Sequence, residues 1–563
     1  MTNKLRVGLL LDSFDIPAWT YVMLEKIRNS DYAEIVLVVL NTSNEQPQNL
    51  FSKLKENCHI LLYLIYCRIE NIVFKPSPNA FENRNAAELL GNIRTLKVSP
   101  RQTQYSDWIR DDDVEAIKQN DIDVFIRLGF RILRGKILTS TKLGIWSYHH
   151  GDNTIARGVP AGFWEVFKNY FVTGSTLQIL TEELDNGLVL YKSYSATDYL
   201  SVNRSRNHCY WKGTSFIPRK LEELYRIGRE KFTQEIKERN QHFTSYSNKC
   251  YQLPKNGEFL KLLFKHFAKC AGIKLYDLFF FNQWILLFDL RAEISTTFWR
   301  FKKIVPPKDR FWADPHVIHK DSQYYVFIEE FPYHANKGHI SLLIMDRTGN
   351  YTKPVKILEQ PYHLSNPFVF EWQGDHYMIP ESSSNRTIEV YKCVSFPYQW
   401  KFYKKLMQDI TAVDPILYYD QQKWWLFTNI SENAGASTLD ELFLFYSDSP
   451  ISDHWTPHPQ NPIVSDVRKA RPAGRIFTHN NNIYRPAQIC SRAYGYGVKI
   501  NQILKLSERE YQEQEMVSIK PNWDKDIKGI HAFDHKSGLT IIDGKLKRAR
   551  FPFWDSRGTK RLD

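Results

Sequence analysis

The feature that most constrains the fold of this 563-residue chain is a pattern repeated five times in its C-terminal half. Each copy has a polar residue, usually before proline, then an apolar strand, a polar turn and a second apolar strand with a polar end. The copies recur at intervals of roughly 50 to 60 residues, a period typical of β-propellers whose blades are built from hairpins. We therefore predict an all-β five-bladed propeller over residues 281–545. The anchor residues of the five copies are Asp314, Asn366, Asp414, Arg471 and His531.

Short phrases around these anchors carry a resemblance to known propellers. They are Phe-Trp-Ala-Asp-Pro from Phe311, Ile-Pro-Glu-Ser from Ile379 and Arg-Pro-Ala-Gly from Arg471. From about Asn282 to Gly544 the chain resembles the propeller that precedes the catalytic domain in plant glucosamine inositolphosphorylceramide transferases, and more distantly the furanosidase-type propeller glycosidases. We further predict that the upstream strand Gln283–Phe288 completes the last blade and closes the ring.

The inner ends of the propeller strands offer candidate substrate-binding residues, namely Asp314, Glu381, Asp414 and Arg471. Two carboxylates flanking a glycosidic bond are what sugar hydrolysis requires. Alternatively, the Asp-Pro and Asn-Pro pairs cap the inner strands, and the carboxylates hold Arg471 and Arg485. In glycosidases of this shape the acid glutamate follows both aspartates, whereas Glu381 lies between them here; its expected counterpart in the first blade is Glu330. We therefore favour a sugar-binding or structural propeller over a hydrolase.

The N-terminal half alternates apolar strands with helices, as α/β folds with a parallel sheet do. Ligands of such sheets bind at the carboxyl ends of the strands. His149, which follows the fourth expected parallel strand, therefore lies where chemistry is expected. A strand pair, 175–180 and 189–193, should follow. The expected parallel strands are Lys4–Leu11, Glu34–Leu40, Asp121–Leu128 and Gly144–Tyr148, and the expected helices are Ile16–Asn29, Phe163–Tyr170 and Leu221–Asn240.

The stretch from Leu143 to Lys192 holds, in order, His149 and His150, Asp152, Arg157-Gly158, Thr173-Gly174 and Leu184-Asp185-Asn186-Gly187. This order resembles the core of the formyltransferase family, which includes methionyl-tRNA formyltransferase and the sugar N-formyltransferases. The family histidine falls on His149, the aspartate on Asp185, and the family asparagine on Ser147. The resemblance implies a Rossmann-like formyltransferase fold with His149, Asp185 and Ser147 as catalytic residues.

The same resemblance assigns further roles. His149 would act as a general acid or electrophile beside a carbonyl, oriented by Asp185, which would then take up the proton of an attacking amine. His150, Asp152 and Arg157 would bind substrate, and the first two could replace the carbonyl-polarising amide lost at Ser147. The alternative is that His149 caps a strand end and Asp185 only forms a turn. The residues implied to hold the pterin ring of the donor, 10-formyltetrahydrofolate, are Gly129, Ile132 and Leu133.

Composition limits the kinds of partner that we expect the protein to bind. The net charge is +13, but Lys and Arg are scattered, so we expect a basic solvated surface and no nucleic-acid binding. The seven cysteines form no Cys-x-x-Cys pair, which argues against disulfides or a metal site and for a reducing, cytoplasmic compartment. We find no signal peptide and no apolar run that could span a membrane. Lys261, Lys265 and Lys269 share one face of the helix expected over Gly257–Lys269, which allows at most peripheral membrane contact.

These observations predict a formyltransferase-like α/β domain (1–225), a helical linker (226–280), the propeller (281–545) and a basic tail (546–563). The expected function is transfer of a formyl group to the amine of a small-molecule amino sugar, nucleotide- or lipid-linked, with the propeller recognising the saccharide. Two alternatives stay open. One is a non-catalytic carbohydrate-binding protein with a degenerate formyltransferase domain, and the other is a propeller that acts on glycosidic bonds.

Overall fold

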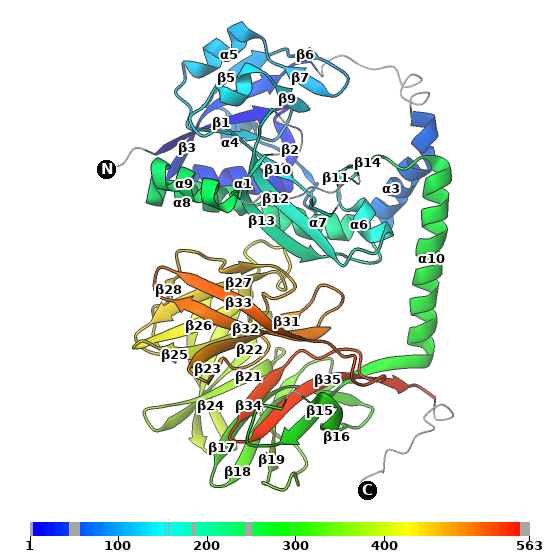
Figure 1. Ribbon diagram of the computed structural model, residues 1–563, viewed down its shortest axis with the longest axis vertical. Helices are drawn as coiled ribbons and strands as arrows, with labels where there is room; N and C mark the ends of the chain where they lie inside the picture. The colour runs from blue at the N-terminus through cyan, green and yellow to red at the C-terminus, as the bar shows by residue number, and fades with distance from the viewer. Residues whose placement is uncertain are drawn as a thin grey trace. The chain divides into compact units, whose positions relative to one another are not determined.

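The computed structural model describes residues 4–43, 57–152, 154–155, 157–182, 187–241, 250–295 and 297–551. The chain divides into two compact units, Met1–His266 with Asn433–Ser437, and Phe267–Glu432 with Thr438–Asp563. The first unit is α/β and the second consists almost entirely of β-sheets (Figure 1), so the prediction of an α/β region followed by a β-rich region is confirmed. The finer division at residues 225, 280 and 545 stays a prediction.

The first unit is built on a seven-stranded sheet with the order β13-β12-β10-β8-β1-β3-β5. The five strands from β10 to β5 are parallel, whereas β12 and β13 form an antiparallel pair at one edge. The predicted parallel strands and the predicted strand pair are thereby confirmed. The bounds are β1 (Leu5–Leu11), β3 (Ala33–Asn41), β5 (Arg94–Val98), β8 (Val124–Arg127), β10 (Ile145–His149), β12 (Val172–Ile179) and β13 (Leu188–Ala196).

Both faces of this sheet are covered, because its central strands are apolar on both sides. One face packs on α1 (Ala18–Arg28), α8 (Phe216–Ile227) and α9 (Arg229–Arg239) through a core that includes Trp146. The opposite face packs on α5 (Asp111–Lys118) through a core that includes Phe125.

The remaining helices are α3 (Leu61–Val73), α4 (Ala87–Leu90), α6 (Phe163–Phe167), α7 (Val202–Gly213) and α10 (Asn256–Phe279). The short strands are β2 (Asp15–Pro17), β4 (Asn83–Asn85), β6 (Arg101–Gln102), β7 (Ser106–Trp108), β9 (Ile132–Arg134), β11 (Arg157–Gly158) and β14 (Cys250–Tyr251).

The strand order reverses direction at β1, because the chain first builds outward through β3 and β5 and then, on the other side, through β8 and β10. The carboxyl ends of β1 and β8 therefore form the switch point at which open α/β sheets bind ligands. Asp12 follows β1, Arg127 ends β8 and His149 ends β10. This edge of the sheet is the part of the first unit that the sequence singled out.

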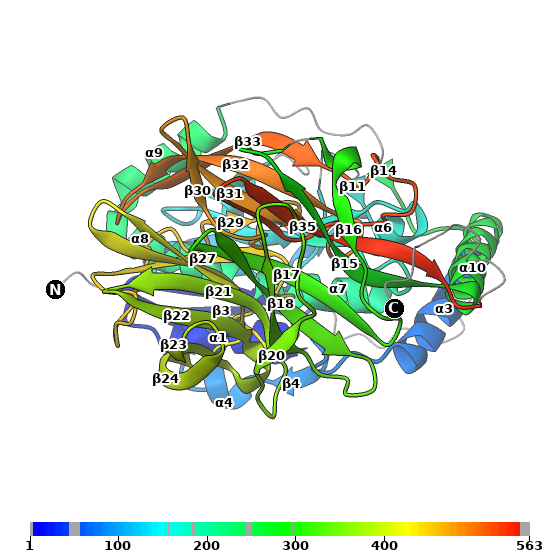
Figure 2. The same ribbon diagram turned by 90° about the horizontal axis from the view of Figure 1, so that it is seen from below.

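The second unit contains five antiparallel sheets of at least four strands each, which we number I to V (Figures 1 and 2). Each of the five repeated sequence segments contributes to one sheet. The bounds are β17 (Arg310–Lys320), β18 (Gln323–Pro332), β19 (His339–Met345) and β20 (Val355–Leu358) in sheet I; β21 (Ser365–Trp372), β22 (Asp375–Ser382), β23 (Thr387–Ser395) and β24 (Gln399–Gln408) in sheet II; β25 (Ala412–Asp420), β26 (Lys423–Ile430), β27 (Glu441–Ser447), β28 (Thr456–Pro457) and β29 (Val464–Ser465) in sheet III; β30 (Phe477–His479), β31 (Asn482–Ile489), β32 (Gly497–Leu506) and β33 (Tyr511–Ile519) in sheet IV; and β15 (Phe280–Leu290), β16 (Lys302–Ile304), β34 (Phe533–Lys536) and β35 (Leu539–Ala549) in sheet V.

Sheet V joins strands from the two ends of the second unit. β15 pairs with β35 along its whole length, from Phe280↔Ala549 to Leu290↔Leu539. The prediction that the strand upstream of the first repeat completes the last sheet is confirmed. The first part of the region predicted as a basic tail belongs to β35, and residues 552–563 lie outside the described residues.

Hydrophobic cores lie between neighbouring sheets. Sheets I to IV share a core with the sheet that follows each of them, and sheet V also shares one with sheet I. A row of five sheets would have four such interfaces, so the fifth interface joins the last sheet to the first. Residues typical of each core are Phe327 and Met378 (I–II), Phe370 and Leu426 (II–III), Trp425 and Ile503 (III–IV), Val498 and Ile542 (IV–V), and Phe288 and Val326 (V–I).

The repeated Asp-Pro and Asn-Pro pairs are β-bulges in the first strands of sheets I, II and III. Asp314, Asn366 and Asp414 have φ angles of 50°, 39° and 49°, and the strand register shifts at each of them. Asp and Asn tolerate this left-handed conformation better than other residues with a Cβ, which accounts for their recurrence at the anchor position. The pairs interrupt strands rather than cap them, so that part of the alternative reading is wrong.

Buried Arg485 should be required for the stability of sheet IV. Its Nε and Nη2 donate to the two Glu513 carboxylate oxygens, each at 2.9 Å, and its Nη groups also donate to the carbonyls of Lys469 and Ala470. Arg485→Met should lower the free energy of unfolding by ~3–5 kcal/mol, because Glu513 would remain buried without its cation. The double variant Arg485→Met/Glu513→Met should recover a large part of that loss. Urea unfolding measures both, and a double variant less stable than the single one would contradict this account.

Candidate functional site

Seven ionisable side chains from sheets I to V meet in the second unit, and we call them the polar cluster. Every member is at most 8% exposed. Carboxylates outnumber cations in the cluster, so its energetics depend on how each negative charge is neutralised. The members are Asp314, Glu329, Glu381, Asp414, Arg471, His531 and Asp543.

Arg471 links sheets II, III and IV. Its Nε donates to Asp414 Oδ2 at 2.6 Å, and its Nη2 donates to Asp414 Oδ1 at 3.2 Å and to Glu381 Oε2 at 3.4 Å. Gln488 Nε2 donates to Asp414 Oδ2 at 2.9 Å. Glu381 Oε2 also accepts from the backbone N–H of Asp414 at 3.3 Å. The predicted contact between carboxylates and Arg471 is therefore present, whereas Arg485 pairs with Glu513 instead.

His531 forms the second ion-pair centre of the cluster. Its Nδ1 lies 2.6 Å from Asp543 Oδ2 and its Nε2 lies 3.0 Å from Asp314 Oδ1. Burial alone would lower the pKa of His531, but the two aspartates outweigh burial and raise this pKa to about 10. Asp314, His531 and Asp543 are close enough for a metal site. An imidazolium has no free lone pair, however, so at neutral pH the arrangement is an ion-pair triad.

Burial raises the pKa of two glutamates of the cluster. Burial, reinforced by Asp414, raises the pKa of Glu381 to about 8, and burial with Asp314 raises that of Glu329 well above its usual range. Glu329, opposite Ala313, is the counterpart of Glu381, opposite Ser365. The predicted counterpart Glu330 is wrong by one residue. Glu330 instead accepts hydrogen bonds from Arg310, Trp312 and Ser341.

This arrangement suits binding better than hydrolysis. Asp314 and Glu381, the carboxylates expected to act on a glycosidic bond, each lie beside a cation, His531 and Arg471 respectively. Beside them lies an aromatic group that sequence reasoning missed. Arg471 lies 5.0 Å from the ring centroid of Tyr494, and His531 packs on Trp284 at 4.1 Å. Tyr494 is 37% exposed as a residue, so part of it is accessible beside the buried charges.

At the carboxyl edge of the first unit, Ser147 is buried and accepts a hydrogen bond from Arg127 Nη1 at 3.0 Å. Arg127 also donates to the Phe130 carbonyl, while its buried Nε–H has no hydrogen-bond partner among the described residues. Arg127 thus brings a cationic donor to the place where the resemblance implies an amide. The sequence did place Arg127 in an expected strand, and its position near the strand's end was the available signal.

The other predicted residues of this edge have different surroundings. His149 is half-buried at the end of β10. His150 stacks on Tyr210 at 3.6 Å, and burial lowers the pKa of His150 to about 3, so it is neutral. Burial would raise the pKa of Asp152, but Lys192 Nζ at 2.6 Å and Thr154 keep this pKa below its usual value.

The prediction that His150 or Asp152 replaces the lost amide stays a prediction. Arg157 lies in β11, paired with Cys250 of β14, and nothing is described of its side chain. Asp185 lies outside the described residues, so its predicted role stays a prediction. A further titratable group, Glu165 of α6, was not predicted. Burial, with a contribution from the charge of Asp152, raises the pKa of Glu165 to about 7, which is typical of acid–base groups.

The loop implied to hold a pterin does not fit one. A pterin needs free backbone donors and acceptors, but the Phe130 N–H donates to Asp12 at 2.9 Å and the Arg131 N–H donates to Asp107 at 2.8 Å. A Cβ at Gly129 would lie 2.4 Å from the Asp12 nitrogen, so the backbone of Asp12 already fills the space beside this glycine. Leu133 is 3% exposed within a core, and Ile132 pairs in β9 with β7. These residues therefore do not support the binding of a folate at this loop.

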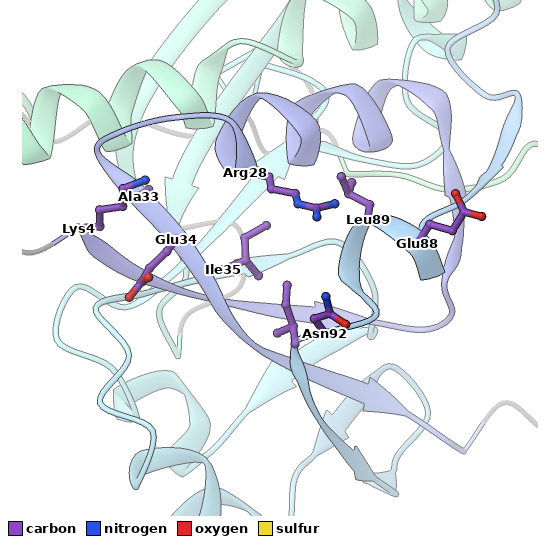
Figure 3. A pocket seen from close by; sticks show the side chains of 9 residues that line it. Lys4, Arg28, Ala33, Glu34, Ile35, Glu88, Leu89 and Asn92 are labelled. Carbon is purple, nitrogen blue, oxygen red and sulfur yellow. The ribbon is translucent and has the colours of Figure 1, made fainter.

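A pocket in the first unit lies at the opposite edge of the sheet (Figure 3). It is lined by residues at the amino ends of β1 and β3, at the end of α1 and in the α4 segment, including Lys4, Arg28, Glu34 and Glu88. Its charges are of both signs and lie far along the strands from His149, so it takes no part in the chemistry at the carboxyl edge.

Comparison with known proteins adds a family likeness for the second unit. The model of the N-terminal region of glucosamine inositolphosphorylceramide transferase 1 matches residues 302–542. This match confirms the resemblance inferred for the C-terminal half. Glucosamine inositolphosphorylceramide transferase 1 of Oryza sativa subsp. japonica is 33% identical over 206 residues, and that of Arabidopsis thaliana is 33% identical over 209 residues. The matches cover 36% and 37% of this chain, and the chain spans only 27% of either relative.

Two solved structures are similar to parts of this chain. Glycinamide ribonucleotide transformylase 1 from Symbiobacterium toebii has a TM-score of 0.28 and 13% identity, over 40% of this chain and 90% of its own. A family 117 glycoside hydrolase from Zobellia galactanivorans has a TM-score of 0.32 and 11% identity, over 50% of this chain and 96% of its own.

The ion pairs of His531 predict a specific pH dependence of stability. Its pKa is about 10 in the folded chain and 6.5 when unperturbed, so its contribution is complete below pH 6.5 and disappears as the pH rises through 10. His531→Gln should therefore cost on the order of a few kcal/mol near pH 6, and the difference from wild type should shrink steadily toward pH 10. Urea unfolding at a series of pH values measures this difference. His376→Gln, a second buried histidine of this unit, is the control, and parallel stability curves for wild type and His531→Gln would contradict the assignment.

Proposed function

We propose that the second unit is a five-bladed β-propeller that binds the saccharide part of an amino-sugar conjugate, lipid- or nucleotide-linked, at Tyr494 and the neighbouring polar cluster. Support for the propeller comes from the five inter-sheet cores and from the pairing of β15 with β35. Hydrogen bonds between sheets also support the propeller. Asp543 accepts from the Asp314 N–H, Asp314 accepts from the Asn366 N–H, and the Phe533 N–H donates to the Ala473 carbonyl.

The observation that carries the binding proposal is the partly accessible Tyr494 beside buried Arg471 and His531. Aromatic rings pack on the apolar faces of sugars, while hydrogen-bonding and charged groups fix orientation. Lys545 Nζ lies 4.6 Å from the Trp284 ring centroid and 5.9 Å from that of Tyr494, which adds a cation suited to a phosphate. The matched relatives are named for an inositolphosphorylceramide that receives glucosamine. A sugar linked to inositol phosphate is therefore the first ligand to test.

Tyr494→Ala should weaken binding of a soluble glucosaminyl-inositol phosphate by about tenfold, equivalent to ~1.4 kcal/mol, because the stacking face is removed. Isothermal titration calorimetry on the full chain measures the Kd. Tyr419→Ala is the matched control, since Tyr419 is an exposed tyrosine of the same unit. The proposal fails if the wild type does not bind, or if the two variants bind equally well. Release of free sugar by the wild type would favour the glycosidase alternative instead.

The carboxyl edge of the first unit supports a second candidate, acyl transfer to an amine. The specific observation is the unpartnered Nε–H of Arg127 beside Ser147, one strand from His149. In this reaction the amine nitrogen forms a bond to the acyl carbon, and the bond between that carbon and its donor breaks. Arg127 would stabilise negative charge on the carbonyl oxygen, and His149 would give a proton to the leaving group. The proton of the amine would pass to a base such as Asp185, as the formyltransferase resemblance implies.

His149→Ala should reduce acylation of a nucleotide-linked amino sugar by about 100-fold or more, because proton transfer by a positioned group contributes at least that factor. Mass spectrometry of the sugar, with formyltetrahydrofolate and other activated acyl donors offered in turn, detects the product. His59→Ala, an exposed histidine elsewhere in the unit, should retain full activity. Equal rates for wild type and His149→Ala would remove this site, and absence of product with every donor would leave the first unit as a binding or structural domain.

A further inference from the structure

Helix α3 has an apolar face that the described residues of the first unit leave exposed. Its inward face consists of Tyr63, Tyr66, Cys67 and Glu70, spaced as one side of a helix. Its outward face is apolar as well, with Ile69 at 54%, Ile72 at 80% and Val73 at 63% exposure. A helix on the surface of a protein in water normally presents polar residues there, so a contiguous apolar face of this kind marks an interaction site. The other exposed apolar residues of α3 are Leu61, Leu62, Leu64 and Ile65.

The first turns of α10 carry further exposed apolar residues. Leu260 and Phe264, one turn apart, are 58% and 75% exposed. The two helices lie side by side (Figures 1 and 2), and Asn256 ties them by accepting from the Leu62 N–H and donating to the Cys58 carbonyl. We call the exposed apolar residues of α3, with Leu260 and Phe264, the apolar face.

The orientation of α3 is fixed by its inward side. Tyr63 packs edge-on against Phe163 and Phe259, and Tyr66 packs against Phe167. At the end of the helix, Asn203 Nδ2 donates to the Phe74 carbonyl and the Asn203 N–H donates to Glu70. Rotation that would bury the apolar face against the unit would break these contacts, so the face is a stable part of the surface.

The charges around the apolar face are mostly positive. Within and next to α3 and the first turns of α10, up to Lys265, five cations are exposed, whereas Glu258 is the exposed carboxylate and Glu70 is buried. Two copies of the chain facing each other through this surface would bring like charges together. An anionic lipid surface would neutralise them and would also accept the aliphatic side chains. The exposed cations are Arg68, Lys75, Lys255, Lys261 and Lys265.

We propose that the apolar face docks on the surface of an anionic lipid bilayer. The 13 residues of α3 extend over roughly 20 Å, less than the ~30 Å hydrocarbon core, so the helix lies in the interface. Among the described residues, none of the helices is long and apolar enough to cross a membrane. The inference goes beyond the saccharide-binding proposal and rests on different residues.

The test is flotation of the full chain with vesicles of phosphatidylcholine, with or without phosphatidylserine. Wild type should bind the vesicles that contain phosphatidylserine, and binding should weaken as salt is raised. The triple variant Ile65→Ser/Ile69→Ser/Ile72→Ser should bind at least about tenfold more weakly, because the inserted aliphatic groups are lost. Val355→Ser/Leu504→Ser/Val517→Ser, which alters three exposed apolar residues of the second unit, is the matched control and should bind like wild type.

A second variant tests the charges without altering apolar residues. Lys261→Gln/Lys265→Gln should weaken binding to phosphatidylserine vesicles and reduce its salt dependence. Failure of wild type to bind, or unchanged binding by the serine variant, would overturn the proposal. A wild-type dimer in sedimentation velocity that the serine variant dissociates, without vesicle binding, would assign the face to a second copy. Calorimetry with the saccharide should be unaffected in the serine variant, so failure of one proposal is distinguishable from failure of the other.

Discussion

The second unit depends on the neutralisation of charge that its five sheets bring together. Five carboxylates meet two cations, and none has ready access to water. Arg471 and His531 neutralise three aspartates, while burial raises the pKa of Glu329 and Glu381 and so favours their protonated forms. Because the partners come from different sheets, the same ion pairs that remove the electrostatic penalty also fix how the sheets are arranged. Removing one partner would leave an uncompensated buried charge, which is far more costly than never having had the pair.

Much of this arrangement was predictable from sequence, because the repeat fixes which residues take equivalent places. The anchors Asp314, Asp414, Arg471 and His531 were all identified, and each lies in the polar cluster. The choice of Glu330 was wrong although the repeat carried the signal, because Glu329 follows Asp314 by the same 15 residues (329−314) by which Glu381 follows Asn366 (381−366). Tyr494 lies between β31 and β32, outside the repeated phrases, so the pattern carried no signal for it.

For the first unit, four of the five parallel strands were predicted, since apolar runs separated by helices leave few alternatives, whereas the edge strand β5, which is mostly exposed, was missed. The surroundings of the candidate site in this unit were harder to predict. Motif matching placed His149 correctly at a strand end, but it could not show that Tyr210 stacks on His150 or that Lys192 holds Asp152. Those partners lie about 40 to 60 residues further along the chain and meet the motif only in three dimensions. Arg127 was missed for a related reason, because it reaches the site through its hydrogen bond to Ser147, which lies on the neighbouring strand β10.

The pairing of β15 with β35 has a consequence for how the chain reaches its fold. A ribosome releases β15 long before β35, so sheet V stays incomplete until nearly all of the second unit has been synthesised. Until then β15 presents an unpaired backbone edge on its β35 side, a surface prone to association with other chains. Bringing two such distant strands together is a slow, non-local step, and sheet V is completed only when it has occurred. The nascent chain would therefore benefit from a chaperone during that interval, even though the finished sheet leaves that side of β15 fully paired.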